Sequence, residues 1–397
     1  MKFADRLRPL QKNVFADMDR AKARVQSLNS QSLIDQSLID LSLGSSDLPT
    51  PAPILETIAA CLPDRHTHGY VLHRNTQDFR RAAAQWYEQK FGLGVDPETE
   101  VLLLIGSQEG TAHLPLAVLN PGDYALLMDP GYPSHEGGVY LANGRVYPMP
   151  LLAEHQFLPR FDTIPATVLA QARLMVLSYP HNPTTTIAPL AFFEEAVDFC
   201  RRHDLILVHD FPYADLAFDS RPPSILQADP SKTCSIEFFS LSKSYNMGGF
   251  RVGYAIGNAD IIQALRQVKA AIDFNQYQGI LQGAITALTG DPSIQRSVEQ
   301  MRQTFQARRD FCVAALQHCG WPVALPPATM YIWAPLPAPW QDRSMEFALT
   351  LVEETGVAVS PGIGFGPSGE GYVRFALVHD RPVLGEAIDR IAAWMGR

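Results

Sequence analysis

The sequence predicts an α/β protein with a large domain built on a mostly parallel, seven-stranded sheet and a smaller α+β domain. Between about residues 50 and 285, short β-prone apolar runs alternate with helical stretches, an order typical of a doubly wound sheet. After about residue 290, the pattern changes to a long helical segment followed by prolines and short strands. The length of 397 residues also exceeds the roughly 100–200 residues of a single domain.

The N-terminal segment, residues 3–28, carries charged and apolar side chains at helical spacing and is predicted to be a helical arm. A tandem QSLID repeat over Gln31–Asp40 indicates a local duplication in a connecting segment, because solenoids need several longer repeats. Seven apolar runs are the predicted strands of the large domain: Val101–Ile105, Tyr124–Met128, Arg145–Met149, Leu174–Tyr179, Leu205–His209, Ile236–Ser240 and Arg251–Ile256. The stretch Pro189–His203 is one of the predicted connecting helices.

The C-terminal part begins with a predicted helix over Ile294–Cys319. Its remaining predicted elements are the strands Met330–Ala334, Val357–Val359 and Tyr372–Ala376 and the helices Ser344–Thr355 and Pro382–Met395. We therefore expect an N-terminal arm (1–48) that completes the small domain, a large domain (49–288) and a small C-terminal domain (289–397).

Composition narrows the class of protein. Hydrophobic residues make up 46% and charged residues 18%, as in globular proteins, and the net charge of -9 argues against a nucleic-acid partner. No uncharged apolar run reaches the ~18 residues that a membrane span needs. The N-terminal segment has no signal-like apolar stretch, and the five dispersed cysteines form no C-x-x-C pair. We expect a cytoplasmic protein with free thiols, no membrane partner and no nucleic-acid partner.

The segment Ser240–Gly253 carries the strongest chemical signal. Lys243 follows a predicted buried strand, and a desolvated lysine becomes nucleophilic and forms Schiff bases with carbonyl compounds. Ser240, Ser242 and Arg251 lie around it and offer the donors that hold a phosphate. From these residues alone, a surface lysine in a glycine-rich turn is an equally good interpretation.

This segment resembles the lysine signature of class I/II aminotransferases, the fold-type I enzymes that use pyridoxal 5′-phosphate (PLP), which reads S-x-S-K-x-x-x-x-x-G-x-R-x-G. The resemblance extends, motif by motif, over nearly the whole chain. It implies that Lys243 forms the Schiff base with PLP and shuttles the proton. It also implies that Ser240 and Arg251 hold the cofactor phosphate, with Ser242 as a further donor.

Two more strand ends fit the same family. Asp210 and Tyr213 lie in Asp-Phe-Pro-Tyr after one strand, where an aspartate by itself could simply cap a helix. The family's D-x-x-Y motif implies that Asp210 pairs with the pyridinium nitrogen and that Tyr213 binds the ring oxygen O3′. Asn182 lies in an Asn-Pro-Thr stretch that alone indicates only a turn. It resembles the motif whose asparagine also binds O3′ and borders the substrate, although Thr185 stands where the family has glycine.

The turn Gly106–Gly110 follows a strand and opens a helix, whose N-terminus suits a phosphate. The resemblance implies that Ser107 and Gln108 contribute to this phosphate site. Tyr132, in Pro-Gly-Tyr-Pro, resembles the aromatic residue that stacks on the PLP ring; its other interpretation is a buried aromatic at a strand end.

Tyr70 lies in a segment similar to the family motif Y-x-x-x-x-G-x-x-x-[LF]-R, whose tyrosine reaches the phosphate of the neighbouring subunit. It therefore implies a homodimer with shared active sites. Asn75 replaces the usual glycine, and since asparagine tolerates left-handed backbone angles, we expect the turn to survive. The nearby cluster of His66, His68 and His73 has no patterned acidic or cysteine partner, so we expect no metal site.

Substrate recognition is expected in the small domain. Arg374 lies in a short predicted strand, where it could point into solvent or grip a carboxylate with two parallel hydrogen bonds. It resembles the family arginine that binds the substrate α-carboxylate, and Gly44 matches the position whose backbone lies beside that carboxylate.

The predicted reaction is ping-pong transamination, in which Lys243 removes the α-proton and the electron pair enters a ring kept protonated by Asp210. Stretches such as Asn13–Asp19 and Gly364–Tyr372 resemble the LL-diaminopimelate aminotransferase branch, which exchanges an amino group with 2-oxoglutarate. An aspartate- or alanine-type aminotransferase, or a PLP β-lyase or cyclase on the same fold, are the alternatives. A PLP-fold regulator is disfavoured because the segment before the α/β region is too short for a DNA-binding domain.

Overall fold

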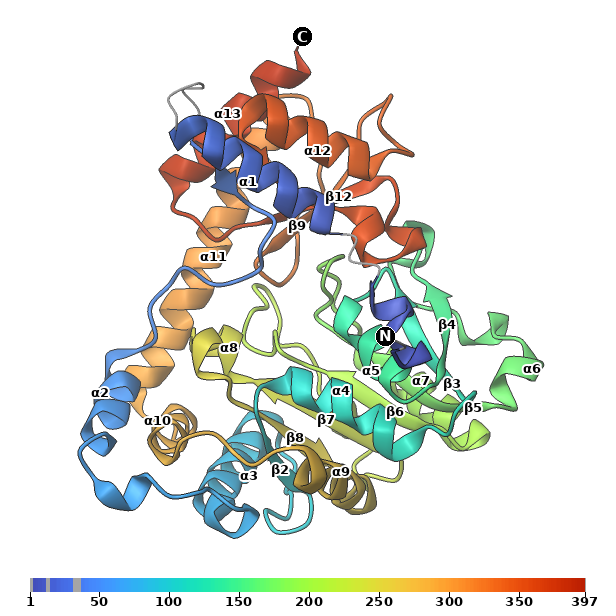
Figure 1. Cartoon of the computed structure of the whole chain (residues 1–397), viewed down its shortest axis with the longest axis vertical. Helices are drawn as coiled ribbons and strands as arrows, with labels where there is room; N and C mark the ends of the chain where they lie inside the picture. The colour runs from blue at the N-terminus through green and yellow to red at the C-terminus, as the bar shows by residue number, and fades with distance from the viewer. Residues whose placement is uncertain (1–2, 12–14, 31–36, 397) are drawn as a thin grey trace.

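The computed structural model describes residues 3–11, 15–30 and 37–396. Its centre is a seven-stranded sheet with the strand order β2-β8-β7-β6-β5-β3-β4 (Figure 1). The strands are β2 (Val101–Leu104), β3 (Tyr124–Asp129), β4 (Arg145–Pro150), β5 (Ala172–Leu177), β6 (Ile206–Asp210), β7 (Ser235–Ser240) and β8 (Gly253–Gly257). Of these seven strands, only β8 runs antiparallel to its neighbours, so the prediction of a mostly parallel seven-stranded sheet is confirmed.

Helices cover both faces of this sheet, and the alternation of side chains along the strands explains why. In β2, Leu102 and Leu104 pack toward α4 (Ser107–Val118), α5 (Pro133–Leu141) and α9 (Ala259–Ile272). Val101 and Leu103 point to the opposite core, which includes α3 (Gln77–Phe91), α7 (Leu190–His203) and α10 (Gln278–Leu288). Strands that are apolar on both sides are typical of parallel sheets. Three further helices complete this part: α2 (Ala52–Cys61), α6 (Ala166–Leu169) and α8 (Leu241–Ser244).

A second core lies above the sheet in Figure 1. It contains a three-stranded antiparallel sheet of order β11-β12-β9 and a parallel pair, β1 and β10. The strands are β1 (Ile39–Asp40), β9 (Tyr331–Pro335), β10 (Val357–Ala358), β11 (Ser360–Pro361) and β12 (Tyr372–Ala376). Four helices pack around them: α1 (Ala16–Ser30), α11 (Pro292–His318), α12 (Ser344–Thr355) and α13 (Arg381–Met395). The long α11 extends from the level of the large sheet to this second core (Figure 1).

Ten short 3-10 turns lie among the described residues: η1 (Asp5–Leu7), η2 (Pro9–Gln11), η3 (Arg65–Thr67), η4 (His73–Thr76), η5 (Ala153–His155), η6 (Phe161–Thr163), η7 (Ile225–Gln227), η8 (Gly248–Phe250), η9 (Gly362–Phe365) and η10 (Pro367–Gly369). The first of them lies against α5 of the large sheet, where Arg6 donates to the Leu141 carbonyl. By contrast, α1 packs on α12.

Gln31–Gln36 of the QSLID repeat, and Asn13–Val14, lie outside the described residues. The domain boundaries stay a prediction. In the part of the chain described here, none of the helices is long and apolar enough to cross a membrane.

Candidate active site

The predicted site residues gather where the parallel strands end. Asp210 is the last residue of β6, Ser240 is the last residue of β7, and Asn182 lies in the loop that leaves β5. Because β5, β6 and β7 run parallel, these three ends meet at one edge of the sheet, which is where such sheets bind ligands.

Lys243 lies in the one-turn helix α8, directly after β7. The Ser240 hydroxyl accepts a hydrogen bond from the Ser242 amide at 3.2 Å and so caps this turn. The Lys243 ammonium donates to the Gly44 carbonyl and lies 5.9 Å from the centre of the Tyr213 ring. The side chain is therefore half-buried and directed into the molecule, unlike the surface lysine of the alternative interpretation.

The position of the Gly44 backbone is fixed by the residues around it. A Cβ atom at Gly44 would lie 1.9 Å from the Tyr331 hydroxyl, so only glycine fits. Arg308 of α11 holds this segment through a two-pronged ion pair with Asp47, with N–O distances of 2.6 and 2.7 Å. Although burial opposes ionisation of Asp47, the contact with Arg308 holds the pKa of its carboxyl below the usual value.

Asp210 is almost fully buried, and only one of its carboxylate oxygens is paired. Oδ2 lies 3.1 Å from Nε2 of His135 in α5. Oδ1 has no hydrogen-bond partner among the described residues. Buried polar atoms are nearly always paired, so this oxygen is a ready acceptor for a donor on a bound molecule, such as a protonated ring nitrogen.

Two tyrosines share a hydrogen bond beside Lys243. The hydroxyls of Tyr213 and Tyr331 are 2.9 Å apart. Burial, reinforced by Tyr331, raises the pKa of Tyr213 well above its usual value. Burial also acts on Tyr331, but the charges of Lys243 and Arg374 outweigh it and lower the pKa of Tyr331. The Tyr213 hydroxyl is thus neutral, and it has a hydrogen-bond partner, Tyr331, that the sequence did not predict.

Arg374 of β12 points into the same region from the small sheet. Its Nη1 donates to Asn182 Oδ1 at 2.7 Å, and its Nη2 donates to the Ser42 carbonyl at 2.7 Å and to Ser360 Oγ at 3.2 Å. The guanidinium also lies 4.2 Å from the centre of the Tyr331 ring. Nε has no partner, and no carboxylate of the described residues forms an ion pair with this arginine. A buried guanidinium without a counter-ion is suited to binding a carboxylate.

A further group of predicted residues surrounds the start of α4. Gly106 has φ +74°, and a Cβ there would lie 2.6 Å from Arg251 Nη2. A Cβ at Gly253 would lie 2.5 Å from the Ser107 amide nitrogen. Arg251 therefore lies against the helix N-terminus, where the amides of Ser107 and Gln108 have no acceptor within the helix. A guanidinium beside free amides at the positive end of a helix dipole fits a phosphate.

The comparisons with known proteins agree with this geometry. A family model described as "Aminotransferase class I and II" matches residues 36–391. The chain belongs to this family. It is therefore a transaminase of fold type I, as the sequence predicted.

Individual relatives of this aminotransferase are similar over their full length. The chain is 41% identical to LL-diaminopimelate aminotransferase 2 of Trichormus variabilis over 393 residues, which cover 98% of each chain. A structure described as a probable N-succinyldiaminopimelate aminotransferase from Thermus thermophilus matches with a TM-score of 0.89 at 42% identity, covering 96% of this chain and 99% of that one. Substrate-bound BacF from Bacillus subtilis matches with a TM-score of 0.92 at 34% identity, covering 99% and 98%.

Two predicted residues of the aminotransferase remain on the surface. Tyr132 precedes α5, is 37% exposed, and its ring centre lies 5.7 Å from that of His135. Tyr70 is 83% exposed and packs on Phe274 with 5.2 Å between ring centres. It borders an open cleft of about 590 Å³.

The two departures from the family motifs have different outcomes. Thr185 adopts φ +66° and so takes the left-handed conformation that usually favours glycine. The turn at Asn75 is present, as η4, but it does not use a left-handed angle, since the φ of Asn75 is not positive. Instead its side chain accepts a hydrogen bond from the Leu72 amide at 3.2 Å and caps the turn η4.

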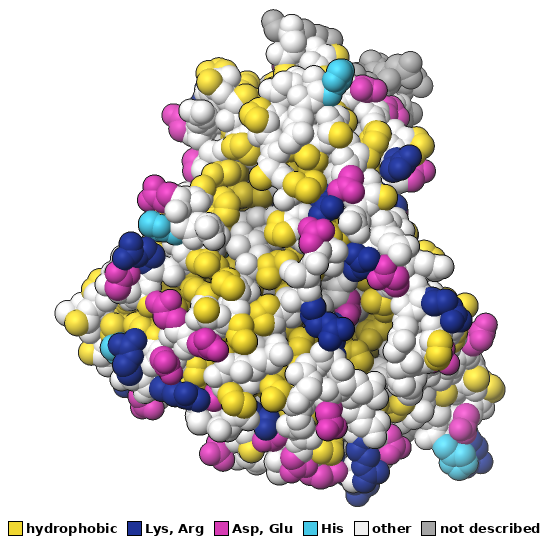
Figure 2. Space-filling model, turned by 180° about the vertical axis from the view of Figure 1, so that it is seen from behind, with side chains coloured by type: hydrophobic (Ala, Val, Ile, Leu, Met, Phe, Trp, Pro, Cys, Tyr) yellow, Lys and Arg dark blue, Asp and Glu magenta, His cyan; other side chains and the backbone are white. Residues whose placement is uncertain are grey.

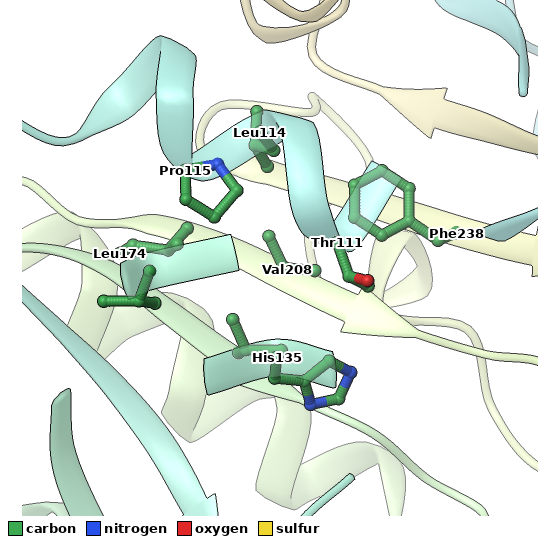
Figure 3. Close-up of a pocket in the computed structure, with 9 residues that line it drawn as sticks. Thr111, Leu114, Pro115, His135, Leu174, Val208 and Phe238 are labelled. Carbon is green, nitrogen blue, oxygen red and sulfur yellow. The ribbon is translucent and has the colours of Figure 1, made fainter. Parts of the chain in front are cut away.

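The sequence did not point to His135, Tyr331 or His181. His135 lines a small apolar cavity of about 10 Å³ between α4, α5 and the sheet (Figure 3), and its Nε2 lies 3.1 Å from Asp210 Oδ2. His181 is fully buried beside Asn182, and burial, with a smaller effect of His135, lowers the pKa of His181 to about 3. The partners of His135 and Tyr331 come from distant parts of the chain, so no local motif pointed to them. His181 contacts Thr184 in the same loop as Asn182, where its position next to that motif was the available signal.

Proposed function

We propose that this chain is a PLP-dependent aminotransferase that exchanges an amino group between LL-diaminopimelate and 2-oxoglutarate. The observation that carries the reaction class is a lysine and an unpaired carboxylate oxygen at one sheet edge, facing a buried arginine without a counter-ion. The substrate rests on the 41% identity to a relative of that name over 98% of both chains.

The residues present fit PLP. The unpaired Oδ1 of Asp210 would accept from the ring nitrogen, and Tyr132 would cover the ring face. Asn182 Oδ1 already accepts from Arg374, which leaves its Nδ2 group as the donor for the ring oxygen, with the neutral Tyr213 hydroxyl as a second partner. The phosphate would be held by donors from three segments: Ser107, Gln108, Ser240, Ser242 and Arg251.

When bound, PLP supplies an electrophilic carbon for the substrate amine and a ring that accepts an electron pair. The protein's own groups do the rest. Arg374 binds the α-carboxylate and thereby orients the Cα–H bond. Lys243 Nζ would remove the α-proton and return it on the other side of the amine nitrogen, at the carbon that the cofactor contributes. Asp210, whose Oδ2 lies 3.1 Å from His135 Nε2, would pair through Oδ1 with the protonated nitrogen at the opposite end of the ring.

The substrate is tested by a spectrophotometric screen of the purified protein, in which each amino acid is assayed for conversion of bound PLP to the pyridoxamine form. We expect LL-diaminopimelate to react fastest. N-succinyl-LL-diaminopimelate is the second candidate, because the T. thermophilus structure of that description is 42% identical. Faster reaction with aspartate, glutamate or alanine would contradict the proposed substrate, and release of pyruvate or ammonia without a keto acid would indicate a lyase.

We infer a homodimer in which Tyr70 completes the phosphate site of the partner. Six large hydrophobic side chains lie exposed in two nearby segments: Leu55, Leu62, Tyr70, Leu72, Ile272 and Phe274. Exposed apolar clusters of this kind mark interaction surfaces. Apolar side chains are also exposed across the middle of the molecule when it is seen from behind (Figure 2). The five thiols are free, which suits a reducing cytoplasm.

The dimer is tested by sedimentation. Wild-type protein is expected at twice the chain mass of 43.9 kDa, and Tyr70→Phe is expected to keep this mass while weakening PLP binding about tenfold, the effect of one lost hydrogen bond to a charged group. A fully active monomer, or unchanged PLP affinity in Tyr70→Phe, would contradict shared active sites.

A further inference from the structure

A buried cluster of charges lies behind the start of α4 and has no part in the chemistry described above. Its centre is Lys269 of α9, whose ammonium contacts Glu109 Oε1 and Asp273 Oδ1, both at 2.7 Å. The Lys269 side chain is only 7% exposed and that of Glu109 only 5%. A buried charge is costly unless it is paired. Removal of Lys269 would therefore leave the Glu109 charge without its cation, whereas removal of Glu109 would leave Lys269 paired with Asp273.

Glu109 belongs to the same turn as the proposed phosphate donors. It lies one and two residues after Gln108 and Ser107, and its Oε2 accepts a hydrogen bond from the Ile105 amide. The Glu109 side chain thus turns back to the residue before the N-cap Gly106 and leaves the amides of Ser107 and Gln108 to a ligand. Burial raises the pKa of Glu109, but its contacts with His113 and Lys269 outweigh burial and lower it, so the carboxylate is ionised at neutral pH.

An ionised carboxylate at this position works against binding of a phosphate, because the two negative charges repel and the carboxylate offsets the positive potential of the helix N-terminus. Lys269 removes that disadvantage by neutralising Glu109. Glu109, His113 and Asp273 each offer a potential metal-ligand atom within 4.8 Å of one another. The carboxylates of Glu109 and Asp273 already pair with the Lys269 ammonium, so the lysine, and not a metal ion, balances their charge.

Lys269 also anchors the segment that follows α9. Its ammonium donates to the Phe274 carbonyl at 3.3 Å. Gln276 Nε2 then donates to the carbonyls of Leu104 and Arg251 at 3.2 and 3.1 Å. Lys269 thus fixes the start of a segment whose Gln276 holds the end of β2 and the backbone of Arg251.

We propose that Lys269 is a positioning residue for the phosphate end of the cofactor: by neutralising Glu109 and fixing the turn into α4, it directs the Ser107 and Gln108 amides and Arg251 toward an anion. The proposal rests on the proposed function, since it requires that PLP binds at this turn. Loss of Lys269 should therefore weaken the binding of the cofactor's phosphate and not that of its ring or aldehyde.

The test compares the dissociation constants of PLP and of pyridoxal, which lacks only the phosphate, by fluorescence titration of the apoprotein. Lys269→Met is expected to weaken PLP binding at least about tenfold, because the negative charge of Glu109 is no longer neutralised by a lysine near the phosphate, and to change pyridoxal binding less than about threefold. The double variant E109Q/K269M is expected to recover PLP affinity to within about threefold of wild type. Lys232→Met, which breaks a large-domain ion pair with Glu100, is the matched control and is expected to leave both ligands unaffected.

The outcomes separate the possible failures. If wild-type protein binds PLP no better than pyridoxal, the proposed phosphate site and function are wrong. If wild type distinguishes the two but Lys269→Met weakens both equally, or the double variant recovers nothing, Lys269 has only a structural role and the inference is overturned. Should Lys269→Met fail to fold, Glu109→Gln carries the test: PLP binding must be equal or tighter, and a tenfold loss contradicts the proposal.

Discussion

Replacing Lys243 with alanine is expected to lower the transamination rate by at least about 10⁴-fold, the upper range for a lost proton-transfer group. The variant loses the only ammonium seen to contact Gly44 and Tyr213 in the described structure. It is also expected to lose the visible absorbance that arises when PLP is linked to a lysine. Both properties are measured on the same purified protein, by stopped-flow transamination and by absorption spectroscopy.

Lys232→Ala is the control for this variant, because Lys232 lies in the same domain and pairs with Glu100, away from the site. It should keep both the absorbance and the rate. Since Lys243 is assigned a proton-transfer role, a small primary amine added to the solution should partly restore the transamination rate of Lys243→Ala. Wild-type rates in Lys243→Ala would show that the assignment is wrong.

Asp210→Asn is expected to reduce the rate about 10³-fold, the effect of removing one strong electrostatic contact to developing charge, and to weaken PLP binding. The asparagine keeps the size of the side chain and a hydrogen-bonding group near His135. It removes the negative charge, so the unpaired Oδ1 position no longer favours a protonated ring nitrogen. The rate, and the PLP dissociation constant, are measured at saturating substrate.

Asp229→Asn provides the matched control. Asp229 is another fully buried aspartate of the large domain, and it pairs with Arg201 at 2.7 Å. Its loss should lower stability but not the rate per folded molecule. Equal rate losses in the two variants would mean that Asp210 acts through folding alone.

The sequence predicted the sheet well because its strands are short, apolar on both faces and separated by helices. For example, β2 was expected over Val101–Ile105 and spans Val101–Leu104. The order of strands was not predictable. The insertion of the antiparallel β8 between β2 and β7 depends on long-range pairing that no local pattern encodes.

The site was predictable where a residue lies in a local motif, as Lys243 and Arg374 do. It was not predictable where the partner is distant in sequence. His135 is 75 residues from Asp210, and Tyr331 is 118 residues from Tyr213. Backbone conformation also escaped prediction: Asn75 caps a turn with its side chain, although the residue type suggested a left-handed angle.

The most direct test of the account is to locate the lysine that links to PLP. The protein loaded with PLP is reduced with borohydride, digested and analysed by peptide mass spectrometry. The account predicts a single pyridoxyl-phosphate adduct on the peptide that contains Lys243. An adduct on another lysine, or no adduct at all, would contradict it.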